Sequence, residues 1–177
     1  MIVYFYERKS ETLYDWSEPA LSRSRISIPY MVSNGYAVFV PDIVYESGHP
    51  GKSAYNCIIS GTESVCRQFP CIDSNRLGID GQSWGGYQSL YLITQTDIFK
   101  AAGAGAPVSN MTSAYEGIEM FSALRRLGSP VWMLQYRGEG HNLTRRSNKK
   151  DLTVRMTEFF GHYLKGEPMP EWMKTTD

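Results

Sequence analysis

A short serine motif flanked by glycines carries the clearest chemistry in this sequence. Residues 81–85 read Gly-Gln-Ser-Trp-Gly, an apolar run ends at Ile79 just before them, and an amphipathic stretch follows. This order predicts a strand, a sharp turn and a helix, with Ser83 at the apex of the turn. Such a turn strains the serine and crowds its neighbours, which favours glycine at both flanking positions. We therefore interpret Ser83 as a nucleophile that forms an acyl-enzyme.

The Gly-x-Ser-x-Gly pattern also arises by chance, in roughly one chain in twenty of this length, where it is no more than a tight turn. The context favours the nucleophile, because an apolar strand precedes the motif, Gly86 extends it and a helical pattern follows. The start of that helix also directs unpaired N–H groups and the positive end of its dipole at the site. Both features suit a developing oxyanion.

His141 is the second candidate for catalysis. It follows the last predicted strand, residues 131–136, in a loop that we expect at the carboxyl edge of the sheet, where Ser83 also lies. Imidazole can take the serine proton and return it to a leaving group near neutral pH, so we predict that His141 is the general base. The alternative is an ordinary solvated loop histidine. His49 and His162 are weaker candidates, because they fall in a turn-rich loop and at the end of a helix.

The composition limits the partners. The chain has 177 residues, which we interpret as one domain over residues 1–177, and 18 basic residues balance 18 acidic ones. A neutral chain has no strong electrostatic attraction to nucleic acid or to an anionic membrane, so we expect a small ester or a short peptide as substrate. We find no motif for a metal, nucleotide or flavin and expect no cofactor. The chain shows neither a long apolar run nor a signal peptide, so we predict a soluble, cytoplasmic protein.

Strand and helix patterns alternate along the chain. Strands are predicted at residues 2–6, 36–40, 77–79, 101–108 and 131–136, and helices at 22–33, 53–68, 84–94, 116–127 and 151–163. Pro168 and Pro170 indicate an extended tail. The alternation demands right-handed crossovers. We therefore predict an α/β fold, with a parallel sheet of about five strands and helices on both faces.

Several segments together carry a family resemblance. They are Tyr-Phe-Tyr at 4–6, Gly-Tyr-Ala-Val-Phe-Val-Pro-Asp at 35–42, Ile-Asp at 72–73, Arg-Leu-Gly-Ile at 76–79, Gly-Gln-Ser-Trp-Gly-Gly-Tyr at 81–87 and Gly-His-Asn-Leu at 140–143. In this combination the chain resembles the catalytic domain of the prolyl oligopeptidase family. The resemblance implies an α/β-hydrolase fold, with Ser83 as nucleophile and His141 as base. It also implies that the N–H of Trp84 and the hydroxyl of Tyr6 hold the oxyanion.

The chain departs from that family in two ways. It carries no β-propeller, and between residues 108 and 116 it omits the helix, strand and loop that bear the family's triad aspartate. Parallel topology brings residues 109–115 and the start of the next helix to the edge of Ser83, and Glu116 is the one carboxylate there. We predict Glu116 as the orienting acid, against the alternative of a simple helix-dipole partner. Asn110, or no third member at all, remain open.

These features support three functions. We predict a serine hydrolase, foremost an esterase on small acyl esters, because losing the acid of a triad costs on the order of ten thousand-fold and esters have good leaving groups. A peptidase acting on short peptides is the alternative, and a catalytically impaired hydrolase is the third. The omitted strand would leave unpaired edges, so we also expect a homo-oligomer, most simply a dimer.

Overall fold

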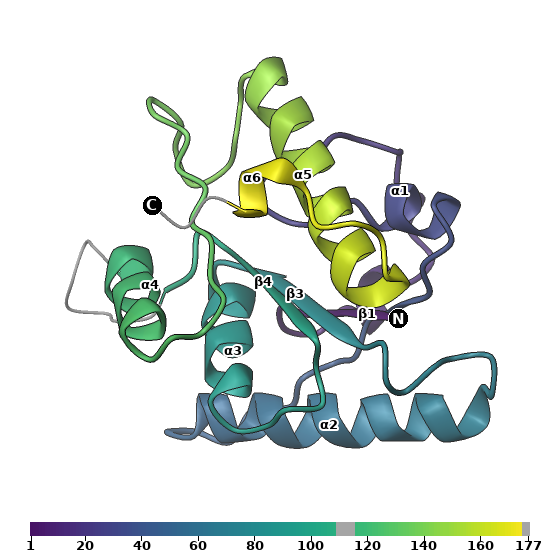
Figure 1. Cartoon of the computed structure of the whole chain (residues 1–177). Coiled ribbons are helices and arrows are strands. Elements are labelled where there is room, and N and C mark those ends of the chain that lie inside the picture. Colours follow the sequence, from purple (N-terminus) through teal and green to yellow (C-terminus); the bar gives the residue numbers. More distant parts are fainter. Residues whose placement is uncertain (109–115, 175–177) are drawn as a thin grey trace.

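A four-stranded parallel sheet forms the centre of the computed structural model, which describes residues 1–108 and 116–174. The strands are β1 (Ile2–Tyr4), β2 (Val38–Phe39), β3 (Gly78–Gln82) and β4 (Ala101–Gly105), in the order β2-β1-β3-β4. Every pair is parallel, so each connection crosses over a face of the sheet. The predicted α/β class, with helices on both faces, is confirmed (Figure 1).

The helices form two layers around this sheet (Figure 1). They are α1 (Ile28–Ser33), α2 (Pro50–Gln68), α3 (Trp84–Ile93), α4 (Glu116–Arg126), α5 (Arg146–Lys165) and α6 (Glu171–Lys174), with a 3₁₀ turn at Ser10–Thr12. Figure 1 shows α2 and α3 below the sheet, and α1, α5 and α6 above it. No helix within the described ranges combines the length and the hydrophobicity that a bilayer crossing needs.

Two apolar clusters cover the two faces of the sheet. Successive residues of a strand point to opposite faces, so Val3 and Phe5 join the cluster under α2 and α3, while Ile2 and Tyr4 join the cluster under α1 and α5. Phe160 of α5 is fully buried in the second cluster. Strands buried on both faces read as continuous apolar runs, which explains why the first strand was readable from sequence.

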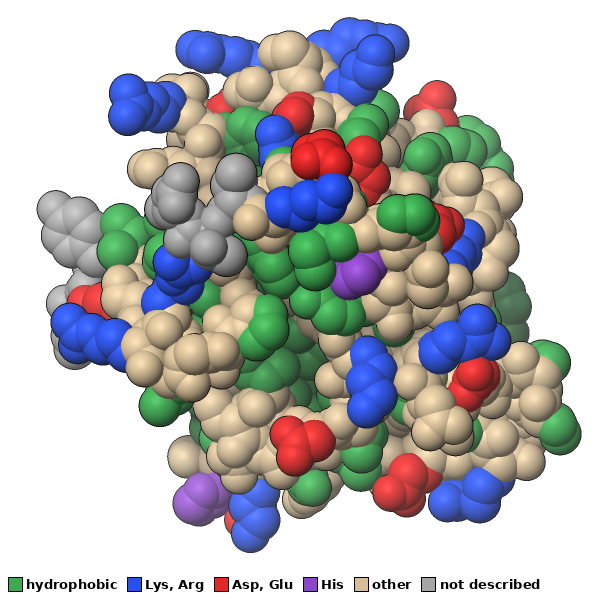
Figure 2. Space-filling model, in the orientation of Figure 1, with side chains coloured by type: hydrophobic (Ala, Val, Ile, Leu, Met, Phe, Trp, Pro, Cys, Tyr) green, Lys and Arg blue, Asp and Glu red, His purple; other side chains and the backbone are tan. Residues whose placement is uncertain are grey.

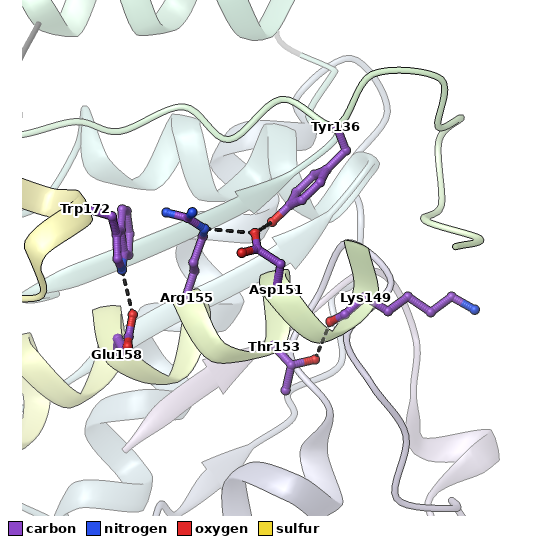
Figure 3. Close-up of polar contacts among 7 residues, drawn as sticks. All are labelled: Tyr136, Lys149, Asp151, Thr153, Arg155, Glu158 and Trp172. Carbon is purple, nitrogen blue, oxygen red and sulfur yellow. Dashed lines mark hydrogen bonds and ion pairs between the residues drawn. The ribbon is translucent and has the colours of Figure 1, made fainter. Parts of the chain in front are cut away.

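The sheet has four strands rather than about five, because residues 131–136 do not form the predicted strand. Within the described chain this segment makes no ladder hydrogen bond with β4 and is held by side chains instead. Trp132 Nε1 donates to the carbonyl of Met173, at 3.0 Å. The Tyr136 hydroxyl donates to Asp151 Oδ2, at 2.7 Å, and Arg155 Nε donates to the same oxygen from the next turn of α5 (Figure 3).

Several other boundaries also differ from the predictions, among them the start of α2, which lies at Pro50 rather than at residue 53. The helix expected at residues 22–33 begins only at Ile28, because Pro29 is tolerated in the first turn of a helix but not in its middle. Residues 22–27 are non-helical. The last long helix begins at Arg146 rather than at residue 151, and it ends at Lys165, capped by Gly166 in the left-handed conformation with a φ of 71°. The tail contains the short helix α6 instead of being wholly extended.

A carboxyl group lies inside this sheet. Asp80 of β3 has no exposed surface, and its Oδ2 accepts a hydrogen bond from the N–H of Ile26, at 3.0 Å. Its Oδ1 has no partner among the described residues and faces Gly103, where a Cβ would lie only 2.3 Å away. Burial raises the pKa of Asp80 from 3.8 to about 7, although the Ile26 hydrogen bond and the Arg25 guanidinium act in the opposite direction.

We predict that Asp80→Asn removes a pH-dependent loss of stability. Because the folded-state pKa lies above the unfolded one, this carboxyl lowers the free energy of unfolding as pH rises from about 4 through 7, by roughly 2–4 kcal/mol. Asparagine keeps an oxygen for Ile26 and cannot ionise. Urea denaturation at pH 5 and pH 8 measures the free energy of unfolding, and its value for the variant relative to the wild type should be larger at pH 8 than at pH 5. An equal difference at both pH values would contradict this assignment.

Candidate active site

Ser83 occupies a strained turn between β3 and α3. Its φ of 58° and ψ of −113° are unusual for a residue other than glycine, and α3 begins at the next residue. The Ser83 N–H donates to the carbonyl of Gly105 at 2.8 Å, and the Ser83 carbonyl accepts from the N–H of Tyr87 at 3.0 Å. The strand, sharp turn and helix predicted around this serine are therefore present.

The glycines on either side of Ser83 are required by space. A Cβ at Gly81 would lie 2.3 Å from the carbonyl oxygen of Gly85, and a Cβ at Gly85 would lie 2.4 Å from the carbonyl oxygen of Phe5. These are backbone atoms, which cannot move aside as a flexible side chain does. The crowding that the motif predicts is thus the observed packing of the elbow.

The start of α3 holds the backbone N–H group that is predicted to stabilise an oxyanion. The N–H of Ser83 already donates to Gly105, and the N–H of Trp84, the next along the chain, has no acceptor inside its own helix. Tyr6 follows β1 and lies beside the same turn, since its Cα is 3.6 Å from the Cβ position of Gly85. The structure thus brings the two predicted oxyanion residues to one end of α3.

Tyr45 ties these two residues together, and sequence reasoning missed it. Its hydroxyl donates to the carbonyl of Tyr6 at 3.0 Å and accepts from Trp84 Nε1 at 2.9 Å. It also accepts from the amide of Gln88, a fully buried side chain that donates to the same Tyr6 carbonyl at 3.0 Å. One hydroxyl thereby uses its donor and both its acceptor positions. Residue 45 stands in a loop without a motif, so the sequence held no signal for it.

The loop of His141 is bound to Gln82, the residue that precedes Ser83. Gln82 Nε2 donates to Asn142 Oδ1 at 2.7 Å and to the carbonyl of His141 at 3.4 Å. The structure thus brings the loop of His141 to the same edge of the sheet as Ser83. The imidazole of His141 is exposed and makes no hydrogen bond to any described residue.

Glu139 fixes the far side of the same loop. Its carboxylate accepts hydrogen bonds from the N–H and the hydroxyl of Thr144, both at 2.7 Å, from the N–H of Arg145 at 3.0 Å and from Asn148 Nδ2 at 2.6 Å. These donors, led by the Thr144 N–H, lower the pKa of Glu139 to about 2. The carboxylate also sits at the N-terminus of α5, where the helix dipole favours negative charge. Glu139 therefore links the two ends of the loop that contains His141.

The orienting acid has no assigned contact. Glu116 is the first residue of α4, but its side chain lies outside the described part of the chain, as does the whole of Asn110. Within the described residues no carboxylate forms a hydrogen bond or an ion pair with the His141 ring. Asp151 is engaged by Tyr136 and Arg155, whose hydrogen bonds outweigh the effect of burial and hold its pKa below the ordinary value.

A parallel sheet that presents a strained serine at the start of a helix defines the class of α/β hydrolases. The chain belongs to the prolyl oligopeptidase family, whose sequence model matches residues 22–117. It is similar to acylaminoacyl peptidase of Pyrococcus horikoshii, with a TM-score of 0.75 and 17% identity over 98% of this chain and 39% of that one. A puromycin-hydrolysing peptidase of Mycobacterium tuberculosis has a TM-score of 0.66 and 19% identity, over 96% of this chain and 35% of that one.

Two curated relatives match shorter stretches. Mouse dipeptidyl peptidase 8 is 46% identical over 52 residues, which are 29% of this chain and 6% of the relative. The uncharacterised peptidase YuxL of Bacillus subtilis is 33% identical over 66 residues, which are 37% of this chain and 10% of the relative. The chain therefore spans only a small part of the length of these relatives. The comparisons establish the family and the α/β-hydrolase fold.

We predict that Tyr45→Phe destabilises the fold by about 1–2 kcal/mol, because the indole N–H of Trp84 and the buried amide of Gln88 lose their shared acceptor. Tyr14→Phe is the matched control, since Tyr14 is 95% exposed. Urea denaturation of both variants measures the difference. Equal midpoints for Tyr45→Phe and wild type would contradict the proposed role of this hydroxyl.

Proposed function

We propose that this chain is a serine hydrolase that cleaves acyl bonds through an acyl-enzyme on Ser83. The observation that carries the proposal is the strained serine at the start of α3, beside a histidine loop that is bound to Gln82. In the first step His141 accepts the proton of Ser83 Oγ while this oxygen bonds to the substrate carbonyl carbon. The leaving group then departs with that proton, and water hydrolyses the acyl-enzyme with His141 again as base.

The oxyanion of each tetrahedral intermediate forms opposite the start of α3. We assign its stabilisation to the backbone N–H of Trp84 and to the hydroxyl of Tyr6. Donors that are fixed before the reaction need no reorganisation when the charge develops. Tyr45 supports this arrangement, because it holds the Trp84 indole and the Tyr6 carbonyl by hydrogen bonds.

Short peptides are the substrate class that the family relationship favours. Several relatives are peptidases by name, among them dipeptidyl peptidase 8 and acylaminoacyl peptidase. One structurally similar acylaminoacyl peptidase is in complex with Z-Gly-Gly-Phe-chloromethyl ketone, a blocked tripeptide derivative. This chain is similar to that protein over 98% of its own length. A short or N-blocked peptide is accordingly the leading natural substrate.

Small acyl esters are the second candidate, and the histidine environment favours them. No described carboxylate contacts the His141 ring, and without an orienting acid catalysis is weakened on the order of ten thousand-fold. The rate of amide hydrolysis is reduced most, because the amine leaves only when the general acid protonates it. A phenol leaves without such help, so an aryl ester tolerates the loss. Glu116 is the residue that we propose as acid, and an impaired hydrolase is the outcome if no acid acts.

Hydrolysis of p-nitrophenyl acetate and of a blocked peptide p-nitroanilide tests both substrate classes. We expect Ser83→Ala and His141→Ala to reduce ester hydrolysis by at least a hundredfold, while His49→Ala, at the N-terminal cap of α2, leaves it unchanged. A further loss of tenfold or more in Glu116→Gln would identify the acid. Measurable anilide hydrolysis by the wild type supports the peptidase. If folded wild type is no faster than Ser83→Ala on either substrate, the hydrolase proposal fails.

We also propose a homodimer. β4 pairs only with β3 in the described sheet, which leaves an unpaired edge, and Trp16 and Leu127 expose 82% and 79% of their surfaces. Charges of both signs are interspersed over the face shown in Figure 2, so apolar and backbone contacts are the expected basis of association. Light scattering after size exclusion at micromolar concentration should give twice the 20.1 kDa of one chain. A single species at the mass of one chain would contradict the dimer.

A further inference from the structure

Residues 22–26, here called the strap, connect the interior of the sheet to the loop of His141. The strap precedes α1, and its backbone makes no helix or strand of its own. Its polar groups instead bond outward, to β3, to α5 and to residues 141–143. These three partners are far apart in the sequence, so the strap links three separate segments of the chain near the site.

Both ends of the strap are anchored in buried positions. At its start, the N–H of Ser22 donates to Thr153 Oγ1 at 2.8 Å, and the same threonine hydroxyl donates to the carbonyl of Lys149 at 2.7 Å (Figure 3). At its end, the N–H of Ile26 donates to the buried carboxyl of Asp80 at 3.0 Å. Because both of its ends are fixed, the middle of the strap has little freedom to move, and a loop bound to it is held in place.

The middle of the strap holds the histidine loop. The carbonyl of Arg23 accepts from the N–H of Leu143 at 2.9 Å, and Ser24 Oγ donates to the carbonyl of His141 at 3.1 Å. The same His141 carbonyl accepts from Gln82 Nε2 at 3.4 Å, on the side of the nucleophile. The backbone of His141 is therefore bound by two side chains from different elements.

Ser24, which makes this contact, has a strained backbone conformation. Its φ of 144° is rare outside glycine and persists only where the surrounding structure holds it. Its carbonyl lies directly over Gly105, where a Cβ would come within 1.6 Å of the Ser24 oxygen. Gly105 is also the residue whose carbonyl accepts the N–H of Ser83. The strap thus touches the nucleophile's support and the histidine's backbone at the same residue.

We propose that Ser24 and Gln82 are positioning residues that set the orientation of His141 toward Ser83. The inference rests on the hydrolase function proposed above and adds the means by which its base is held. An orienting carboxylate normally acts on the imidazole itself, but none contacts this ring in the described chain. Fixing the backbone carbonyl from two sides limits the rotation of the residue, and a misplacement of about 1 Å can cost on the order of a hundredfold in rate.

Steady-state ester hydrolysis by Ser24→Ala, Gln82→Ala and the double variant tests the proposal. We expect kcat to fall about tenfold in each single variant and about a hundredfold in the double, with KM unchanged, because the contacts act on the base and not on the substrate. Ser24→Gly also removes the hydroxyl while relieving the strained φ, so it tests the same contact in a backbone that folds readily. Ser60→Ala is the control, since Ser60 is an exposed serine that donates to a backbone carbonyl within α2.

The imidazole signal of His141 gives a readout that needs no turnover. The chain has three histidines, so their Cε1 proton resonances can be assigned with His141→Ala. We expect the His141 resonance of the double variant to move toward that of a free histidine, while those of His49 and His162 stay in place. Unchanged resonance and unchanged kcat in the double variant would overturn the proposal. If the wild type proves inactive, the resonance alone decides, which separates failure of this inference from failure of the hydrolase function.

Discussion

The hydrogen bond from the N–H of Ser83 to the carbonyl of Gly105 is the contact on which the rest of the site depends. It joins the strained turn after β3 to the end of β4, and so holds a φ of 58° that a free chain would not keep. It also gives the serine's own N–H an acceptor, whereas the first N–H groups of α3 have none inside their own helix. The glycines at 81 and 85 are the spatial condition for this turn, since a Cβ at either would meet backbone oxygen.

Two sets of hydrogen bonds, one made by Tyr45 and one by the strap and Gln82, hold the segments next to this turn. On one side Tyr45 binds the carbonyl of Tyr6 and the indole of Trp84. On the other side the strap and Gln82 bind the backbone of His141. In both sets the acceptors are largely backbone carbonyls, whose positions are fixed by the sheet and by the loops around it. The segments around Ser83, Trp84 and His141 are therefore held together by hydrogen bonds, without an ion pair among these described residues.

The sequence predicts the parts of this site that are set locally. The strand, turn and helix around Ser83 follow from neighbouring residues, and the histidine loop follows from its position after the last apolar run. The strand expected at residues 131–136 was wrong, because pairing depends on a partner edge elsewhere, and Trp132 and Tyr136 bind α6 and α5 instead. Tyr45 stands in a loop without periodicity, and Ser24 falls in a segment that was wrongly predicted as helix, so the contacts of both depend on tertiary structure alone. The catalytic and oxyanion roles of Ser83, His141, Glu116, Trp84 and Tyr6 all stay predictions.

Covalent labelling with a fluorophosphonate, followed by peptide mapping in a mass spectrometer, tests the central claim most directly. Such reagents react with a serine that is activated by a base and presented beside oxyanion donors. The account predicts one adduct per chain, located on Ser83, and a strongly reduced labelling rate in folded His141→Ala protein. A folded wild-type protein that takes up no reagent, or that carries the adduct on another residue, would contradict it.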